Sequence, residues 1–246
     1  MIQSFEGHSF LVDPLAKHPV VLDLGANYGS FSAAIATRHP GVRIVGAEPV
    51  PDLHSSLPEI AGAVFHQVAV SGERDRLKLF LNPGEDAATL VPEMRQPNVE
   101  SIDVDVVTLD DLLADLDGTR LGLIKMDIEG AETAVLLDSP RTTLKRADQI
   151  SVEFHDFLDP SRTQSVVDCE DRLTSLGFDV IRFSRDNSNV LFVNTEAVRL
   201  GLPSRLWVMA RYVYLAGSLR ILRRGLAQRS KIFARRTSRR YPARTP

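Results

Sequence analysis

The 246-residue sequence has a single cysteine and no uninterrupted apolar run of about 20 residues, the length that a membrane-spanning helix needs. One cysteine excludes a disulfide within the chain, and a protein of this size buries enough surface to fold without one. The first thirty residues also lack the basic start and apolar run of a secretory signal. We therefore expect a globular protein in a reducing compartment, the cytoplasm, with Cys169 as a buried thiol.

Charge is distributed unevenly along the chain. The overall formal charge is −3, but the residues from Ala197 onward include 13 Lys and Arg and neither Asp nor Glu. An acidic body therefore carries a basic tail, and the composition predicts a boundary near Glu196. We expect one domain over residues 1–196 and a basic tail over residues 197–246.

The acidic body alternates strand-like and helix-like stretches, which is typical of a parallel sheet with helices on both faces. The predicted strands cover residues 20–24, 43–47, 63–70, 121–126, 150–154, 178–183 and 190–193. The predicted helices cover residues 28–37, a stretch that ends before Pro140, residues 161–176, and a short helix capped by Thr108 and Asp111. Polar and apolar residues alternate over 101–107, which predicts an additional, half-exposed strand.

The last two predicted strands are separated only by the turn-forming residues 185–189, and so short a connection predicts an antiparallel hairpin. The expected fold is therefore α/β and doubly wound. Its mostly parallel, seven-stranded sheet ends in an antiparallel hairpin, and a basic helical C-terminal tail follows.

The turn after the first predicted strand is rich in glycine. Gly25 and Gly29 occupy positions typical of a ligand-binding strand-to-helix turn, but Asn27 replaces the glycine that a dinucleotide fingerprint would have between them. Asp23 would repel a pyrophosphate and attract an ammonium group, such as that of a cofactor bearing an amino acid. Glu48 ends the next strand, where a carboxylate can accept both hydroxyl protons of a ribose.

The sequence resembles the FkbM-type methyltransferases, which belong to the seven-stranded class I methyltransferases. The resemblance covers residues 20–194 and rests on the blocks LDLGANYG (22–29), GAEP (46–49) and KMDIEGAE (125–132). It implies that S-adenosyl-L-methionine is the cofactor and that the methyl acceptor is a hydroxyl of a small molecule or glycan, of the sugar or polyketide type. The implied cofactor-binding residues are Asp23, Gly25, Ala26, Asn27, Gly29, Ser30, Glu48, Pro49, Ala69 and Asp127.

Methyl transfer to an alcohol requires a group that removes the hydroxyl proton. Lys125 and Asp127 share one side of their strand, as do Glu153 and His155 on the next. We expect His155 to be the general base, because an unperturbed imidazole accepts protons at neutral pH, with Asp127 and Glu153 beside it. A metal-free site is favoured. The alternative is a divalent cation, Mg²⁺, held by the Asp127 and Glu153 carboxylates.

The basic tail predicts an amphipathic helix, because apolar residues recur every seven positions from Trp207 while several arginines lie on the opposite side. Its apolar side could pack on the body, on a partner subunit or on an anionic membrane, and the oligomeric state stays open. One alternative function is a nucleic-acid methyltransferase that uses the tail as a phosphate clamp. It is disfavoured because the motif at 127–130 differs from the platform of enzymes that methylate base amines. The other alternative is a non-catalytic cofactor-binding protein.

Overall fold

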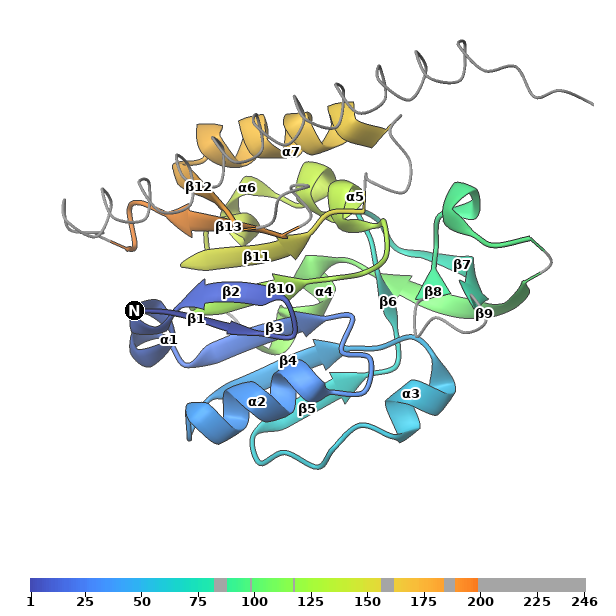
Figure 1. Ribbon diagram of the computed structural model, residues 1–246, viewed down its shortest axis with the longest axis horizontal. Helices are drawn as coiled ribbons and strands as arrows, with labels where there is room; N and C mark the ends of the chain where they lie inside the picture. Colours follow the sequence, from blue (N-terminus) through green and yellow to red (C-terminus); the bar gives the residue numbers. More distant parts are fainter. Residues whose placement is uncertain (82–87, 98, 117, 156–161, 184–188, 199–246) are drawn as a thin grey trace, which may run out of the picture. The chain divides into compact units, whose positions relative to one another are not determined.

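Figure 1 shows the computed structural model, which describes residues 1–81, 88–97, 99–116, 118–155, 162–183 and 189–198. Its largest sheet has seven strands in the order β12-β13-β11-β10-β3-β4-β5. Their bounds are β3 Val20–Leu24, β4 Arg43–Ala47, β5 Ala63–His66, β10 Leu123–Met126, β11 Gln149–Glu153, β12 Phe178–Arg182 and β13 Asn189–Asn194.

Neighbouring strands of this sheet pair in parallel except at β13, which is antiparallel to both β11 and β12. The predicted α/β class is therefore confirmed, and the sheet contains the antiparallel pairing that the short 185–189 connection predicts. Residues 184–188 themselves lie outside the described part of the chain.

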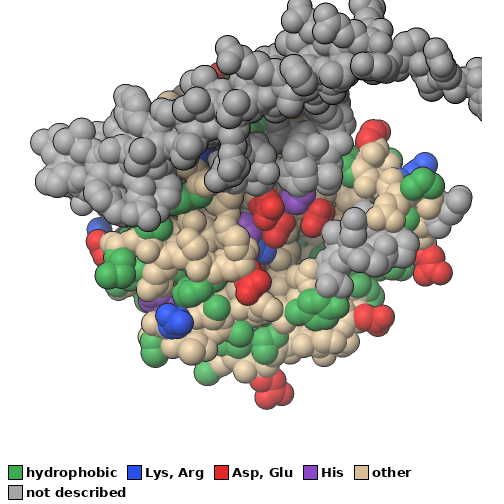
Figure 2. Space-filling view, in the orientation of Figure 1, with side chains coloured by type: hydrophobic (Ala, Val, Ile, Leu, Met, Phe, Trp, Pro, Cys, Tyr) green, Lys and Arg blue, Asp and Glu red, His purple; other side chains and the backbone are tan. Residues whose placement is uncertain are grey.

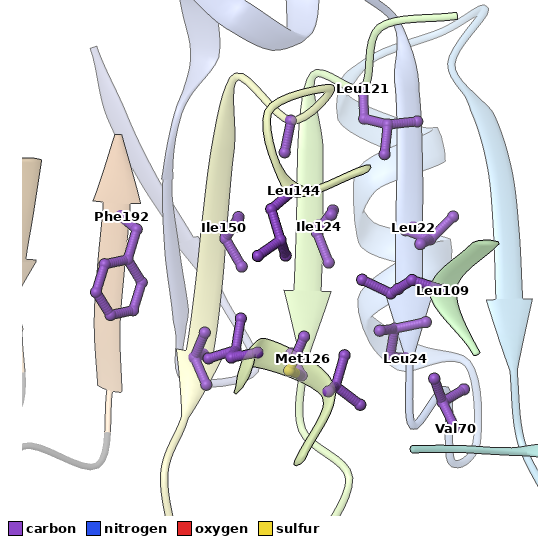
Figure 3. Packing of buried hydrophobic residues seen from close by; sticks show 14 of the residues in the cluster. Leu22, Leu24, Val70, Leu109, Leu121, Ile124, Met126, Leu144, Ile150 and Phe192 are labelled. Carbon is purple, nitrogen blue, oxygen red and sulfur yellow. The ribbon is translucent and has the colours of Figure 1, made fainter. Parts of the chain in front are cut away.

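Alternate residues of the central strands enter two separate cores, because successive side chains of a strand point to opposite faces. Val21 and Ile44 belong to one core, with Leu15 and Phe31. Leu22 and its equivalents on β4 and β10 belong to the other, which Figure 3 shows at close range. The helices are α1 Val12–Lys17, α2 Ser30–Arg38, α3 Pro51–Ser55, α4 Leu109–Leu112, α5 Glu132–Asp138, α6 Arg141–Leu144 and α7 Thr163–Ser175. The first core involves α1 and α2, and the second involves α4 to α7, so helices cover both faces of the sheet.

A second sheet of four strands lies beside the carboxyl ends of β4 and β5 (Figure 1), in the order β6-β9-β7-β8. Its strands are β6 Ala69–Val70, β7 Asp75–Leu81, β8 Ala88–Thr89 and β9 Glu100–Val107. The prediction of a half-exposed strand over 101–107 is confirmed by the alternating burial of β9.

The prediction of one continuous strand over residues 63–70 is wrong. The chain leaves the large sheet after His66, and Ala69 and Val70 pair with β9 instead. Val70 packs into the main core while Ala69 packs into the core of the small sheet, so β6 joins the two.

An antiparallel N-terminal hairpin, β1 Ile2–Phe5 and β2 His8–Leu11, was not predicted. Its two-residue turn, Glu6 and Gly7, has positive φ at both positions, as the favoured hairpin turns require. The four residues of β2 are all buried, and the Gln149 side chain both donates to the Leu11 carbonyl and accepts from its amide. The hairpin is therefore held against β11.

The short helix α4 begins at the predicted cap, since Thr108 and Asp111 form a reciprocal capping box. Cys169 is fully buried in α7, as expected, and burial raises the pKa of its thiol to about 12. None of the helices among the described residues is long and apolar enough to cross a membrane. The tail over 199–246 lies outside those residues, so the boundary near Glu196 and the amphipathic helix stay predictions.

Candidate functional site

Two loops meet at the carboxyl edge of the large sheet, one after β3 and one after β10. Gly25 has a φ of +77°, and a Cβ atom at this position would lie 1.8 Å from the Asp127 carbonyl oxygen. Only glycine therefore lets the two loops approach this closely. Gly29, which caps α2 with a φ of +74°, is similarly restricted, because a Cβ there would lie 2.5 Å from Pro58 Cδ.

Two clefts share this edge and have Gly25, Asn27 and Asp127 in common. The first is lined by Gly25, Asn27, Ala47, Glu48, Pro49, Val50, Leu53, Val68, Ala69, Val70, Leu79, Ala88, Leu90, Asp127, Ile128 and Glu129. The second is lined by Glu6, His8, Gly25, Ala26, Asn27, Tyr28, Ser30, Phe31, Lys125 and Asp127. Eight of the ten predicted cofactor-binding residues therefore line one cleft or both. The exceptions are Asp23 and Gly29.

Glu48 is tied to the glycine turn by its own carboxylate. One oxygen accepts the Asn27 amide at 2.8 Å, and the other accepts the Val50 amide at 2.9 Å. A carboxylate has about four acceptor sites, so each oxygen keeps capacity for a further donor in the cleft. Burial raises the pKa of Glu48, and the two backbone hydrogen bonds oppose that effect.

Asp23 has an ammonium partner from the protein instead of the one that the sequence suggested. The Lys125 Nζ lies 3.2 Å from Asp23 Oδ1, and the Ser32 hydroxyl donates to Oδ2 at 2.6 Å. Asp23 is fully buried, and in this structure its carboxylate holds Lys125. A contact between Asp23 and the cofactor stays a prediction.

Lys125 in turn connects the two loops. Its Nζ donates to the Gly25 carbonyl at 2.6 Å and to the Leu24 carbonyl at 3.3 Å, and it lies 4.0 Å from Asp127 Oδ2. Burial alone would lower the pKa of Lys125, but the charges of Asp23 and Asp127 outweigh it and raise the pKa. Lys125 is therefore positively charged where it lines the second cleft.

His155 lies among three carboxylates. Figure 2 shows acidic and histidine side chains close together near the centre of the face in view. Its Nδ1 is 3.0 Å from Glu132 Oε1, while Nε2 is 3.2 Å from Glu129 Oε2 and 3.7 Å from Asp127 Oδ1. Burial would lower the pKa of His155, but the hydrogen bond and charge of Glu132, with the other two charges, raise it to about 9.

The reason for choosing His155 as general base therefore does not hold in this structure. An imidazole with a pKa near 9 carries its proton at neutral pH and donates hydrogen bonds to its neighbours. The structure does bring His155 next to Asp127, as predicted. Its surroundings suit a fixed positive charge, and a catalytic role for His155 stays a prediction.

The neighbouring carboxylates have different surroundings. Burial would raise the pKa of Asp127, but the hydrogen bond to His8 and the charge of Lys125 lower it to about 2. Burial raises the pKa of Glu129 to about 7. Glu132 accepts the backbone amides of Ile128 and Gly130, so it holds the loop that precedes α5, whereas the N-cap residue of that helix, Ala131, makes no side-chain cap.

The residue that the sequence did not identify is His8. Its Nε2 lies 3.5 Å from Asp127 Oδ2, and its Nδ1 lies 3.3 Å from the Ser151 hydroxyl. Glu153, at the end of β11, completes a group with His8 and Asp127 whose ligand atoms all lie within 4.8 Å of one another. The sequence signal that points to His8 is the hairpin turn at Glu6 and Gly7, because it predicts a strand that begins at His8.

The family model described as the methyltransferase FkbM domain matches residues 23–180. The chain is 29% identical over 209 residues to the AMB antimetabolite synthetase AmbE of Pseudomonas aeruginosa, covering 68% of this chain and 10% of that protein. It is 28% identical over 171 residues to the 31-O-demethyl-FK506 methyltransferase FkbM of Streptomyces tacrolimicus, covering 56% and 65%. It is 27% identical over 161 residues to the 2-O-methyltransferase NoeI of Sinorhizobium fredii, covering 58% and 66%.

The chain thus spans less than two thirds of the length of each of these relatives. The matched family region, by contrast, covers well over half of the chain and contains both loops of the site. It begins at Asp23, includes Glu48 and Asp127, and ends within β12. The chain therefore belongs to the FkbM methyltransferase family.

Proposed function

We propose that this protein is an S-adenosyl-L-methionine-dependent methyltransferase that acts on a hydroxyl group of a small molecule or glycan. The observation that carries the proposal is the pair of adjoining clefts, of which the first is lined by Glu48 and both are lined by Gly25 and Asp127. A ligand that extends through both clefts would meet a carboxylate suited to a ribose in the first cleft and a second carboxylate where the clefts meet.

We place the cofactor in these clefts in one direction. The first cleft would hold the adenosine, with the ribose hydroxyls donating to Glu48 and the base against Ala69. The second cleft would hold the methionine part, near Ala26 and Ser30. Asp127 lines both clefts, so its negative charge would lie where the positive sulfonium passes between them. Bound S-adenosyl-L-methionine would supply the methyl group.

Oxygen as the acceptor atom is supported by two relatives. The names of the Streptomyces and Sinorhizobium proteins both specify O-methylation. This chain's residues would have two tasks: to align the acceptor hydroxyl with the methyl group, and to receive the proton that the hydroxyl loses. Asp127, which lines both clefts, and Glu153 beside it are the groups that we place at this task, and the protonated His155 would hold Asp127 in position.

Calorimetry with S-adenosylhomocysteine, without nucleotide or metal, tests the cofactor assignment. Glu48→Ala removes charge-assisted hydrogen bonds, each worth about 1.5 to 3 kcal/mol, so affinity should fall by at least tenfold. The matched control is Asp52→Ala, which removes a carboxylate from an exposed position on α3 and should leave affinity unchanged. Thermal unfolding of both variants checks that the fold is retained.

Three results would contradict the proposal or part of it. NAD binding without S-adenosylhomocysteine binding would exclude the methyltransferase assignment. An unchanged affinity in Glu48→Ala would show that the ribose lies elsewhere. Tight cofactor binding without methyl transfer to any panel of sugars, polyketides or simple alcohols would favour the non-catalytic alternative.

A further inference from the structure

We infer from the geometry that His8, Asp127 and Glu153 form a binding site for a divalent cation. The three side chains come from three separate segments: the N-terminal strand β2, the loop after β10, and the end of β11. Their ligand atoms, one imidazole nitrogen and two carboxylate oxygens, all lie within 4.8 Å of one another. The sequence alone left a cation at Asp127 and Glu153 as an alternative, and the hairpin adds the nitrogen ligand.

The orientation of His8 suits metal binding. Its side chain is fully buried, its ring packs edge-on against Phe31 with centroids 5.8 Å apart, and its Nδ1 lies 3.3 Å from the Ser151 hydroxyl. A histidine that binds a metal through one nitrogen usually donates the proton of its other nitrogen to a fixed acceptor, which sets the tautomer. Here Nδ1 would donate to Ser151, and the lone pair of Nε2 would point toward Asp127 Oδ2.

Without a cation, that tautomer places a lone pair against a carboxylate oxygen 3.5 Å away. A positive ion between the two atoms turns this repulsion into attraction. In the opposite tautomer Nε2 donates its proton to Asp127, and no cation is needed. The two arrangements differ in whether the protein binds a divalent ion through His8.

Glu153 provides an independent reason to expect a cation. Its half-buried carboxylate forms no hydrogen bond or ion pair within the described part of the chain, and the opposing charge of His155 acts on it only at longer range. The nearby cationic groups are already engaged, since Lys125 pairs with Asp23 and His155 with Glu132. A carboxylate that is half removed from water and lacks a partner is unfavourable, and a bound cation would compensate it.

The distances are compatible with one ion. With metal–ligand bonds of about 2.1 Å, two ligand atoms of the same ion lie roughly 3 to 4.2 Å apart. The His8–Asp127 distance of 3.5 Å falls in this range. The other pairs of ligand atoms lie at most 4.8 Å apart, so rotation of a flexible side chain such as Glu153 is enough to bring all three atoms into bonding distance of one ion. A second trio, formed by Asp127, Glu132 and His155, is less suitable because its histidine and Glu132 are already hydrogen-bonded to each other.

The site meets the second cleft through Asp127, whose side chain is partly exposed. An ion between Asp127 and His8 could therefore complete its coordination with oxygen atoms of water or of a bound ligand. One imidazole and two carboxylates suit a first-row divalent ion such as Mn²⁺ better than Ca²⁺, which prefers oxygen ligands alone.

Titration of the full-length, metal-free protein with Mn²⁺, followed by electron paramagnetic resonance of the free ion, tests this inference without any methyltransferase assay. We expect one bound ion per chain. His8→Ala and Glu153→Gln should each weaken Mn²⁺ binding by at least tenfold, and Ser151→Ala should weaken it by a smaller factor. His54→Ala, at a partly buried histidine on α3, and Glu59→Gln, at an exposed carboxylate, are the matched controls and should bind as the parent protein does.

Absence of Mn²⁺ binding up to millimolar concentration would overturn the inference, as would unchanged binding in both His8→Ala and Glu153→Gln. Thermal unfolding shows whether His8→Ala remains folded. If His8→Ala does not fold, Mn²⁺ binding by Glu153→Gln and Ser151→Ala still tests the inference, because both residues belong to β11 and not to the β1–β2 hairpin. S-adenosylhomocysteine calorimetry is separate, so failure of the metal site and failure of the proposed function give different results.

Discussion

Lys125→Met should be among the most destabilising single changes in the large sheet. Lys125 and Asp23 are both buried, and their charged atoms lie 3.2 Å apart at the ends of adjacent strands. Removal of the lysine leaves the Asp23 carboxylate in the core with only the Ser32 hydroxyl as a donor. Loss of one partner of a buried ion pair costs about 3 to 5 kcal/mol, because the remaining charge is uncompensated. The carbonyls of Leu24 and Gly25 also lose their side-chain donor.

The pair can be separated from the packing around it by a double-mutant cycle. In Asp23→Asn/Lys125→Met the neutral amide no longer needs a cation, so the double variant should be less destabilised than the sum of the single changes by about 1 to 3 kcal/mol. Urea unfolding followed by circular dichroism gives the three free energies by linear extrapolation. Lys78→Met is the control, since Lys78 forms an exposed pair with Asp103 at 3.4 Å and should change stability by at most about 1 kcal/mol.

Two outcomes would refute this reasoning. One is a Lys125→Met variant that is no less stable than Lys78→Met. The other is strict additivity of the Asp23→Asn and Lys125→Met effects, which would mean that the two side chains do not interact in the folded protein. Either result would leave the Asp23 carboxylate without a protein cation and favour the ammonium group of a cofactor as its partner, as the sequence first suggested.

Three further predictions concern the site and the tail. Gly25→Ala should abolish S-adenosylhomocysteine binding, because the added Cβ would collide with the Asp127 carbonyl. Gly41→Ala is the control: Gly41 also has a positive φ, but nothing lies within 4 Å of the added Cβ, so this change should only reduce stability. Equal effects of the two changes on binding would contradict the loop geometry. His155→Asn should lower turnover by about 10²-fold, because the imidazolium that positions Asp127 is lost, while cofactor affinity stays within a few-fold; intact turnover would remove His155 from the reaction. A chain ending at Val198 should still bind S-adenosylhomocysteine but, unlike the full-length protein, should not sediment with anionic vesicles. If the shortened chain aggregates and the full-length protein does not bind vesicles, the tail belongs to the core or to a subunit interface.

The location of the site could be predicted from the sequence because it depends on strand ends. The carboxyl ends of parallel strands lie at one edge of a sheet, so Gly25, Glu48 and Asp127 had to converge once β3, β4 and β10 were recognised as neighbours. The glycine requirement at position 25 follows from the same convergence, but its cause, the Asp127 carbonyl, belongs to a segment 102 residues further along and is visible only in the structure.

The N-terminal hairpin could not be predicted on the same grounds. Its strands are four residues long, and the entirely buried β2 shows no alternation of polar and apolar residues. The burial of His8 depends on docking against β11 through Gln149, a contact between residues about 140 positions apart. Because His8 is the nitrogen ligand of the inferred cation site, the sequence could suggest only the two carboxylates.

The role of a titratable side chain was harder to predict than its position. The sequence predicted that Lys125 and Asp127 share one side of their strand, and Lys125 Nζ does lie 4.0 Å from Asp127 Oδ2. The same expectation for Glu153 and His155 stays a prediction. The charge of His155, however, is set by Glu132 and Glu129, which approach from the loop and helix that follow the neighbouring strand. Three carboxylates near one imidazole favour the imidazolium, and the same reasoning explains why Asp23 lies against Lys125: a buried charge is stable only when an opposite charge lies close to it, whichever segment supplies that charge.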